Sequence, residues 1–190
     1  MIACIRTMLD EHRSAIDRIE ATLTDQIAQA ATEMLQCLRS GGKILVMGNG
    51  GSAADAQHLV AELVGRFLLE RRPLPALALT TNSSSLTAIA NDYGYDDVFA
   101  RQVEALADPQ DLVLGISTSG HSPNVLKALQ VARHKGCRTL ALLGRDGGVI
   151  RAAVDLPLVV DVAQTPRIQE AHALIIHMLC GLIDAGIVEA

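Results

Sequence analysis

Residues 43–58 read KILVMGNGGSAADAQH, and this stretch decides the fold. It opens with a short apolar run from Lys43 to Met47, passes through a glycine-rich turn and continues as a helical pattern. The run is apolar throughout rather than alternating, which is typical of a strand covered on both faces. The stretch therefore predicts a buried strand that leads directly into a helix.

The same unit recurs along the chain. Further apolar runs occupy Pro75–Thr80, Asp111–Ser117, Arg138–Leu143 and Asp155–Val160. Helical patterns lie between the runs, near residues 52–70, 84–106, 122–135 and 165–187. Strands that alternate with helices indicate a parallel sheet with right-handed crossovers. We therefore predict a flavodoxin-like, three-layer α/β/α sandwich around a central five-stranded parallel sheet.

The first 40 residues form a separate pattern. Apolar residues recur at helical spacing from Ile5 to Ile19 and again from Ile27 to Leu38. Thr24 is a suitable cap between the two runs, and Gly41-Gly42 would end the second. This pattern predicts an N-terminal helical hairpin with apolar residues to spare for contact with another subunit. No linker or repeat interrupts the rest, so we expect one domain over residues 1–190.

Composition excludes several classes of protein. The formal net charge is −5 and aromatic residues make up 2%, which argues against a single-stranded nucleic-acid groove. We interpret the adjacent pair Arg71–Arg72 as a solvated helix end. No run reaches the roughly 20 continuous apolar residues of a membrane span, and the N-terminus lacks a signal-sequence pattern. We therefore expect a cytoplasmic protein without a membrane or nucleic-acid partner.

The four cysteines carry no evident chemistry. They are scattered, with no C-x-x-C pair and no zinc-finger spacing. In a chain without a signal peptide, such cysteines are expected to be reduced and mostly buried.

The turn after the first strand is a candidate anion site. Gly48, Asn49, Gly50, Gly51 and Ser52 follow the strand directly, and Ser52 is a suitable cap for the next helix. Helix N-termini bind anions through free N–H groups. The alternative is a tight strand-to-helix turn without a ligand. The segment lacks the Gly-Lys-Ser/Thr of a Walker A loop and the G-x-G-x-x-G of dinucleotide folds.

A second candidate follows the strand at residues 111–117. Its sequence is Ser117-Thr118-Ser119-Gly120-His121-Ser122-Pro123, and Pro123 suits the first turn of a helix. Hydroxyl and free N–H groups together make a phosphate cradle that needs neither a metal nor a lysine. The alternative is a loop that merely caps a helix, but the density of hydroxyls favours phosphate.

Two helical segments each offer a pair of polar side chains. His58 and Glu62 lie four residues apart and share a helix face. Gln169 and His177 lie eight apart on the last predicted helix, within about 80° of each other. The four side chains suit a divalent metal such as zinc, while Glu62 and a histidine also suit acid/base catalysis.

Plainer interpretations of these residues stay open. His58 and Glu62 are also compatible with an exposed pair, and His177 with a core histidine. His172 is an alternative to Gln169 or His177, and His121 is placed to touch a substrate in the serine loop.

Taken together, these motifs resemble those of the bacterial phosphoheptose isomerases, which have the sugar-isomerase (SIS) fold. The resemblance rests on residues 48–58 with Glu62, on Asn91-Asp92-Tyr93-Gly94, on residues 115–120, and on Arg167-Ile168-Gln169-Glu170 with His177. These segments occur in order over nearly the whole chain, so the set is more specific than any single loop.

The resemblance implies a homotetrameric isomerase. It would convert sedoheptulose 7-phosphate to glycero-manno-heptose 7-phosphate through an enediol, early in heptose and lipopolysaccharide biosynthesis. Glu62 and His177 would be the acid/base pair. One zinc ion per subunit would be bound by His58, Glu62, Gln169 and His177. Substrate would contact Asn49, Gly50, Gly51, Ser52, Glu62, Arg66, Asn91, Asp92, Ser117, Thr118, Ser119, Ser122 and Gln169.

Two departures from the family pattern stand near the expected site. His121 occupies a position where many members have Asn, and Thr81-Asn82-Ser83-Ser84 replaces a more usual Thr-Asp-Thr-Ser. Neither removes a proposed catalytic group, but either is able to adjust substrate preference.

Non-catalytic relatives supply the leading alternative function. Some SIS proteins bind the bacterial replication initiator and tend to lose the acid/base residues, which this chain retains. A sugar-phosphate sensor would need a DNA-binding module for which 190 residues leave no room. A SIS-type etherase would be a longer chain.

Overall fold

The computed structural model describes residues 1–188 and contains the predicted five-stranded parallel sheet. The strands lie in the order β2-β1-β3-β4-β5. Their bounds are β1 (Ile44–Gly48), β2 (Ala76–Ala78), β3 (Leu112–Ser117), β4 (Arg138–Gly144) and β5 (Leu156–Val160). All four strand pairings are parallel, so every carboxyl end lies at one edge of the sheet.

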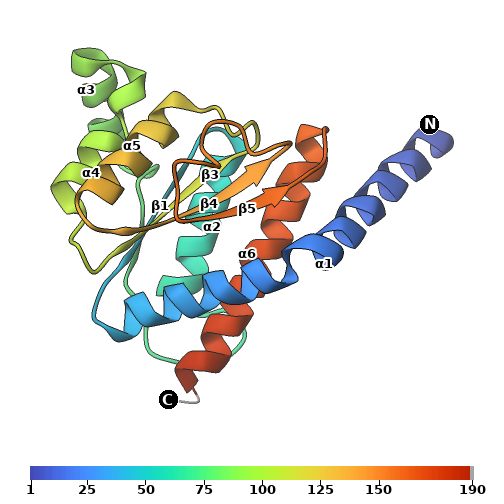
Figure 1. Cartoon of the computed structure of the whole chain (residues 1–190), viewed down its shortest axis with the longest axis horizontal. Helices are drawn as coiled ribbons and strands as arrows, with labels where there is room; N and C mark the ends of the chain where they lie inside the picture. The colour runs from blue at the N-terminus through green and yellow to red at the C-terminus, as the bar shows by residue number, and fades with distance from the viewer. Residues whose placement is uncertain (189–190) are drawn as a thin grey trace.

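Helices cover both faces of this sheet, as Figure 1 shows. One layer contains α1 (Ile2–Arg39), α2 (Gly51–Val64) and α6 (Thr165–Val188), and the other contains α3 (Ser83–Tyr93), α4 (Ala100–Leu106) and α5 (Pro123–His134). Successive strand residues point to opposite faces. Ile44 and Val46 therefore join the core under α1, α2 and α6, while Leu45 and Met47 join the core under α4 and α5. The three-layer sandwich is confirmed.

The N-terminal hairpin was a wrong prediction, because residues 2–39 form one continuous helix. Thr24 does not cap a second helix: its hydroxyl donates to the carbonyl of Glu20 at 2.8 Å, within α1. A threonine satisfied in this way does not interrupt a helix. Residues 1–10 are exposed, and this end of α1 extends beyond the rest of the molecule (Figure 1). The predicted stop at Gly41 is confirmed by its φ of 83°.

Two other helix predictions were too long. The pattern over residues 84–106 is divided into α3, a short 3-10 helix η1 (Tyr95–Asp97) and α4. The division follows Gly94, whose φ of 96° is unsuited to a continuing helix. The pattern over residues 52–70 ends at Val64, and Gly65 closes the helix through a hydrogen bond to Ala61.

A buried ion pair holds the segment that follows α2 against α6. Arg71 donates through Nε to Asp184 at 2.7 Å, and the two side chains are 2% and 1% exposed. Arg71 also donates to the carbonyls of Glu62 and Leu63 at the end of α2. The interpretation of Arg71 as part of a solvated helix end was therefore wrong.

Asp184 is fully satisfied in this position. Its carboxylate accepts the N–H groups of Leu68 and Leu69 at 2.9 and 3.0 Å in addition to Arg71. Burial alone would raise the pKa of Asp184, but these hydrogen bonds and the Arg71 charge together lower it. The ionised form is therefore the one that the fold stabilises.

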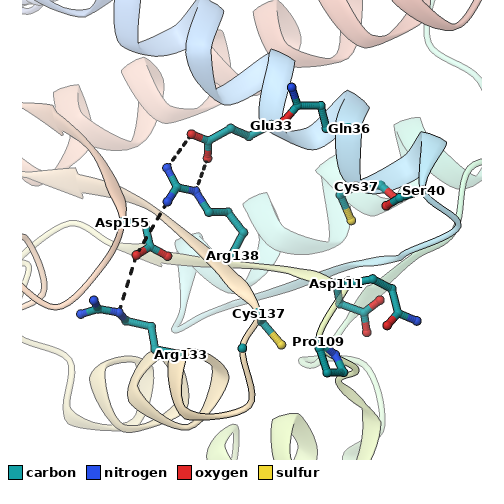
Figure 2. Close-up of a pocket in the computed structure, with 12 residues that line it drawn as sticks. Glu33, Gln36, Cys37, Ser40, Pro109, Asp111, Arg133, Cys137, Arg138 and Asp155 are labelled. Carbon is teal, nitrogen blue, oxygen red and sulfur yellow. Dashed lines mark hydrogen bonds and ion pairs between the residues drawn. The ribbon is translucent and has the colours of Figure 1, made fainter.

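Charged side chains also connect α1 to the amino edge of the sheet. Arg138 binds Glu33 of α1 through two hydrogen bonds of 2.6 and 2.7 Å, and Asp155 lies between Arg138 and Arg133 (Figure 2). These residues line a cavity of about 730 Å³ that also contains two cysteines. Burial raises the pKa of the Cys37 thiol to about 11. The four cysteines are free, and all except Cys4 are buried, as predicted.

Helix α6 is long and apolar enough to cross a membrane by length and composition alone, with a mean hydropathy of 1.8. It lies instead against α1, α2 and the sheet, and residues such as Ile175, Ile176 and Leu179 belong to the core. We conclude that α6 is a core helix of a soluble protein.

Asp184→Ala is expected to lower the free energy of unfolding by about 3–5 kcal/mol, because it leaves the Arg71 guanidinium buried without its partner. Denaturant titration at pH 7 and fixed protein concentration measures this loss. The control is Asp10→Ala, which removes the exposed partner of Arg13 and should cost no more than about 1 kcal/mol. Equal losses in the two variants would contradict the assignment.

The same pair contributes to acid sensitivity. Because folding lowers the pKa of Asp184, its contribution to stability is present above the unfolded-state pKa and is lost as pH falls through the folded-state pKa. The stability of Asp184→Ala should consequently fall less steeply with pH below about 4 than that of the wild type.

Candidate functional site

The two candidate loops emerge side by side at the carboxyl edge of the sheet. Strands β1 and β3 are neighbours, with Gly48 opposite Ile116. The chain order reverses at this point, since β2 lies on one side of β1 and β3 on the other. Such a reversal is where open α/β sheets bind ligands.

The glycine loop leads tightly into α2. Gly50 is the N-cap with a φ of 56°, and the helix begins at Gly51. The prediction that Ser52 caps this helix was wrong: Ser52 lies inside the first turn, and its N–H donates to the carbonyl of Asn49. Ser52 is 3% exposed and thus helps to fix the turn.

Asn49 connects the glycine loop to the start of α5. The side-chain amides of Asn49 and Asn124 exchange two hydrogen bonds of 2.9 Å, and Tyr95 donates to the Asn49 oxygen at 3.2 Å. The sequence argument missed Asn124 and Tyr95. Neither lies in the quoted loops, although Asn124 directly follows the Ser-Pro pair that begins α5.

Hydroxyl groups gather in the serine loop, as predicted. Ser117 lies 2.8 Å from Ser122 and 3.5 Å from Ser119, measured between Oγ atoms. Ser119 also accepts the N–H of His121 at 3.2 Å. Thr118 belongs to the same turn, and Ser122 with Pro123 begins α5. The loop thus presents several hydroxyls next to the N-terminus of a 12-residue helix.

His58, Glu62 and His177 meet across α2 and α6. The Nε2 atom of His58 lies 3.3 Å from a Glu62 carboxylate oxygen and 3.2 Å from Nε2 of His177. Phe67 stacks on the His177 ring with centroids 5.4 Å apart. His177 is exposed rather than a core histidine. The two helices therefore bring an acid/base pair of side chains to one imidazole.

Gln169 and His172 occupy different surroundings. The Gln169 amide lies against Gly51, where a Cβ atom would collide with it. His172 is 0% exposed, and its Nε2 lies 3.1 Å from the carbonyl of Leu143. Burial lowers the pKa of His172 to about 4, so it is neutral at physiological pH. Gln169 is thus the side chain of α6 that reaches the glycine loop, and His172 is a core residue.

Three other predicted substrate contacts are exposed, and within residues 1–188 they form no hydrogen bond or ion pair with this group. Arg66 follows the end of α2, is exposed and lies 3.7 Å from Glu70. Asn91 and Asp92 are exposed on α3, and the hydrogen bonds given by their side chains within residues 1–188 are only to each other. Asp55, which the sequence argument did not single out, lies on α2 one turn before His58. Burial raises the pKa of Asp55 against the effect of the His58 charge.

The proposed zinc ligands offer suitable donors: two imidazoles, a carboxylate and an amide. In a tetrahedral site with Zn–N distances of about 2.0–2.1 Å, neighbouring nitrogens are about 3.3 Å apart. The two separations around His58, 3.2 and 3.3 Å, match that value. Within residues 1–188, however, no group of three or more His, Cys, Asp or Glu side chains is arranged to hold a metal ion. The donor types and two distances fit zinc, but a complete ligand set is not preformed.

Comparisons with known proteins identify the family of this chain. Residues 8–144 match the model of the SIS domain family. The phosphoheptose isomerase of Geobacter sulfurreducens is 59% identical over 184 residues, which cover 97% of each chain. That of Pelobacter propionicus is 57% identical over 187 residues, covering 98% of this chain and 99% of its own.

Solved structures give the same result. The phosphoheptose isomerase of Neisseria gonorrhoeae superposes with a TM-score of 0.91 at 47% identity, covering 96% of this chain and 98% of its own. That of Francisella tularensis superposes with a TM-score of 0.94 at 40% identity, covering 97% and 98%. With its glycine loop, serine loop and paired helices at the carboxyl edge of the sheet, this chain belongs to the phosphoheptose isomerase family of SIS-domain proteins.

Proposed function

We propose that this protein converts sedoheptulose 7-phosphate to glycero-manno-heptose 7-phosphate, as an aldose–ketose isomerase that supplies heptose biosynthesis. The observation that carries the proposal is the meeting of Glu62 and His177 at the His58 imidazole, beside a hydroxyl-lined loop. A scaffold protein needs no such group, whereas the isomerisation needs a base, an acid and a seat for the phosphate.

Glu62 is the proposed base. In the ketose, a C1–H bond must break while a C1=C2 double bond forms, which gives an enediol whose O2 has gained a proton. A carboxylate within hydrogen-bond reach is suited to remove the C1 proton. Glu62 is one-quarter exposed and stands on a rigid helix, so it is accessible to substrate and held in place.

His177 is the proposed partner for protons on the oxygens. The enediol becomes the aldose when C2 gains a proton and O1 loses one, so protons must also move between O1 and O2. An imidazole accepts a proton at one nitrogen and donates from the other. Phe67 and His58 border the His177 ring and restrict its orientation.

The serine loop is the proposed seat for the phosphate. Its hydroxyls already contact one another through Ser117, so little rearrangement is required when an anion replaces those contacts. Holding the phosphate orients the sugar chain toward Glu62 and reduces the entropic part of the barrier. The two hydrogen bonds between Asn49 and Asn124 fix the position of the glycine loop relative to the start of α5, which directly follows the serine loop.

We also propose that the site takes a zinc ion, with His58, Glu62, Gln169 and His177 as ligands. A bound zinc ion would polarise the carbonyl and hydroxyl oxygens of the sugar. The donor types support this assignment, and small side-chain rotations would be required to complete the ligand set.

A homotetramer in the cytoplasm is the proposed assembly. An apolar groove lies between α1 and α6, and its lining includes Ile16, Phe67, His177, Met178 and Leu182. Ile2, Ile5, Met8 and Leu9 are exposed on the free end of α1. Large apolar surfaces of this kind mark protein interfaces.

Glu62→Gln and His177→Ala are each expected to lower kcat by about 100-fold or more, the scale of acid/base catalysis. Conversion of sedoheptulose 7-phosphate to an aldose measures this effect. Glu104→Gln and His134→Ala, at exposed positions on α4 and α5, are the matched controls. Near-normal turnover in either site variant would refute its assignment.

Chelation is expected to abolish activity, and added zinc to restore it. Metal content should be determined on the same samples by mass spectrometry. A sample with no bound metal and full activity would rule out an essential metal ion.

The assembly is tested by light scattering after size-exclusion chromatography, which should give about four times the chain mass of 20.2 kDa. Leu182→Lys, in the groove, should lower the mass, whereas Leu106→Lys, similarly exposed on α4, should not. A monomeric wild type, or a Leu182→Lys variant of unchanged mass, would contradict the proposal.

A further inference from the structure

The turn after β4 carries a backbone anomaly beside the serine loop. Arg145 is the one non-glycine residue with positive φ among residues 1–188, at 58°. An arginine side chain in this conformation costs free energy, and such residues cluster at ligand sites. Gly147 and Gly148 also have positive φ in this turn. Position 145 has the same kind of backbone conformation but carries an arginine instead of a glycine.

This turn and the serine loop pack backbone against backbone. The N–H of Ile150 donates to the carbonyl of Gly120 at 3.1 Å. A Cβ atom at Gly120 would collide with the backbone of Gly147, and one at Gly144 with the carbonyl of Thr118. The side chain of His121 also lies against Gly148. The position of Arg145 is therefore set by the loop proposed to hold phosphate.

Arg145 lines a cavity with Ser119 and His121. The cavity measures about 520 Å³ and opens beyond the ends of β4 and β5, where Asp146, Asp161, Val162 and Ala163 complete its walls. It adjoins the serine loop on the side away from the glycine loop, since β4 follows β3 in the sheet.

Arg145 is the one arginine that lines this cavity, beside the carboxylates of Asp146 and Asp161. Asp161 pairs with Arg18 of α1 at 3.1 Å, and Asp146 accepts the N–H of Gly148 at 3.0 Å. Arg145 forms no ion pair or side-chain hydrogen bond with the residues that the structure describes, 1–188. The serine loop itself has hydroxyl and N–H donors but no lysine or arginine. The serine loop can hold a phosphate through its hydroxyl and N–H groups alone, and Arg145 would add a permanent positive charge beside it.

We propose that Arg145 is the charge partner of the substrate's phosphate, a positioning residue that binds the phosphate from the β4 side while the serine loop binds it from the β3 side. This inference rests on the proposed function, and deepens it. The guanidinium offers two parallel N–H donors to phosphate oxygens, which favours arginine over a neutral residue at this position. The substrate's phosphate is on C7 and the reaction occurs at C1 and C2, so the chemical step is left to Glu62 and His177.

The experiment compares Arg145→Gly and Arg145→Lys with the wild type. Glycine accepts a φ of 58° and removes the charge, so this variant should fold with equal or higher thermal stability. Arg145→Gly should raise KM for sedoheptulose 7-phosphate about tenfold or more, the effect of losing a charge-assisted hydrogen bond, while kcat stays within about twofold. Arg145→Lys should recover most of the affinity. Arg133→Gln, which removes a half-exposed cation at the opposite edge of the sheet, is the control for net charge and should leave KM unchanged.

Inorganic phosphate provides a readout that does not depend on turnover. Calorimetric titration should show the same loss of phosphate affinity in Arg145→Gly, and the loss should be non-additive with that of Ser119→Ala because both side chains bind one anion. If the wild type fails to isomerise the sugar but phosphate affinity still depends on Arg145, the proposed function fails and the anion site stands. Unchanged KM and phosphate affinity in Arg145→Gly would overturn the inference, as would an Arg145→Lys variant no better than Arg145→Gly.

Discussion

The buried contact between Arg71 and Asp184 is the constraint on which the site depends. Glu62 belongs to α2 and His177 to α6, and no covalent link shorter than a hundred residues joins them. Arg71 binds the carbonyl of Glu62 itself and the carboxylate of Asp184, seven residues beyond His177. A buried charge without a partner raises the free energy of the folded state. Separating the two helices would leave Arg71 and Asp184 in that condition, so the ion pair opposes their separation. The proposed catalytic geometry is thus held by groups to which no part in the chemistry is assigned.

A second constraint acts at the edge of the sheet. The glycine loop, the serine loop and the turn after β4 emerge from neighbouring strands, and each contacts the next through backbone or amide groups rather than long side chains. Backbone contacts restrict the conformations of these loops, so the donors that we propose to bind the substrate are already oriented. Preorganised donors of this kind stabilise a transition state without rearrangement during the reaction.

Much of this was predictable from residue patterns, for physical reasons that differ by element. Five uniformly apolar runs predict five strands covered on both faces. The hydroxyl-rich and glycine-rich turns directly after two of them predict that both candidate loops lie at one edge of the sheet. The spacing of His58 with Glu62 and of Gln169 with His177 allowed one pocket but did not require it.

The prediction of an N-terminal hairpin was wrong because sequence alone does not distinguish a threonine that caps a helix from one whose hydroxyl bonds to a carbonyl inside a continuous helix. Arg71 was misplaced because its partner lies 113 residues away, and Asn124 was missed because an amide pair across loops leaves no periodic signal.

The glycine-on-glycine approach of Gly120 to Gly147 and Gly148 has a consequence for evolution. A larger residue at Gly120 or Gly148 would collide with the backbone of the other turn unless that backbone moved away. Substitutions in the two turns are therefore expected to occur together. Variation in substrate size and charge is therefore confined to neighbouring positions that are not glycine, and His121 and Arg145 are two of them. Relatives that act on other phosphorylated sugars would be expected to diverge first at these two positions, while the glycines between them stay fixed.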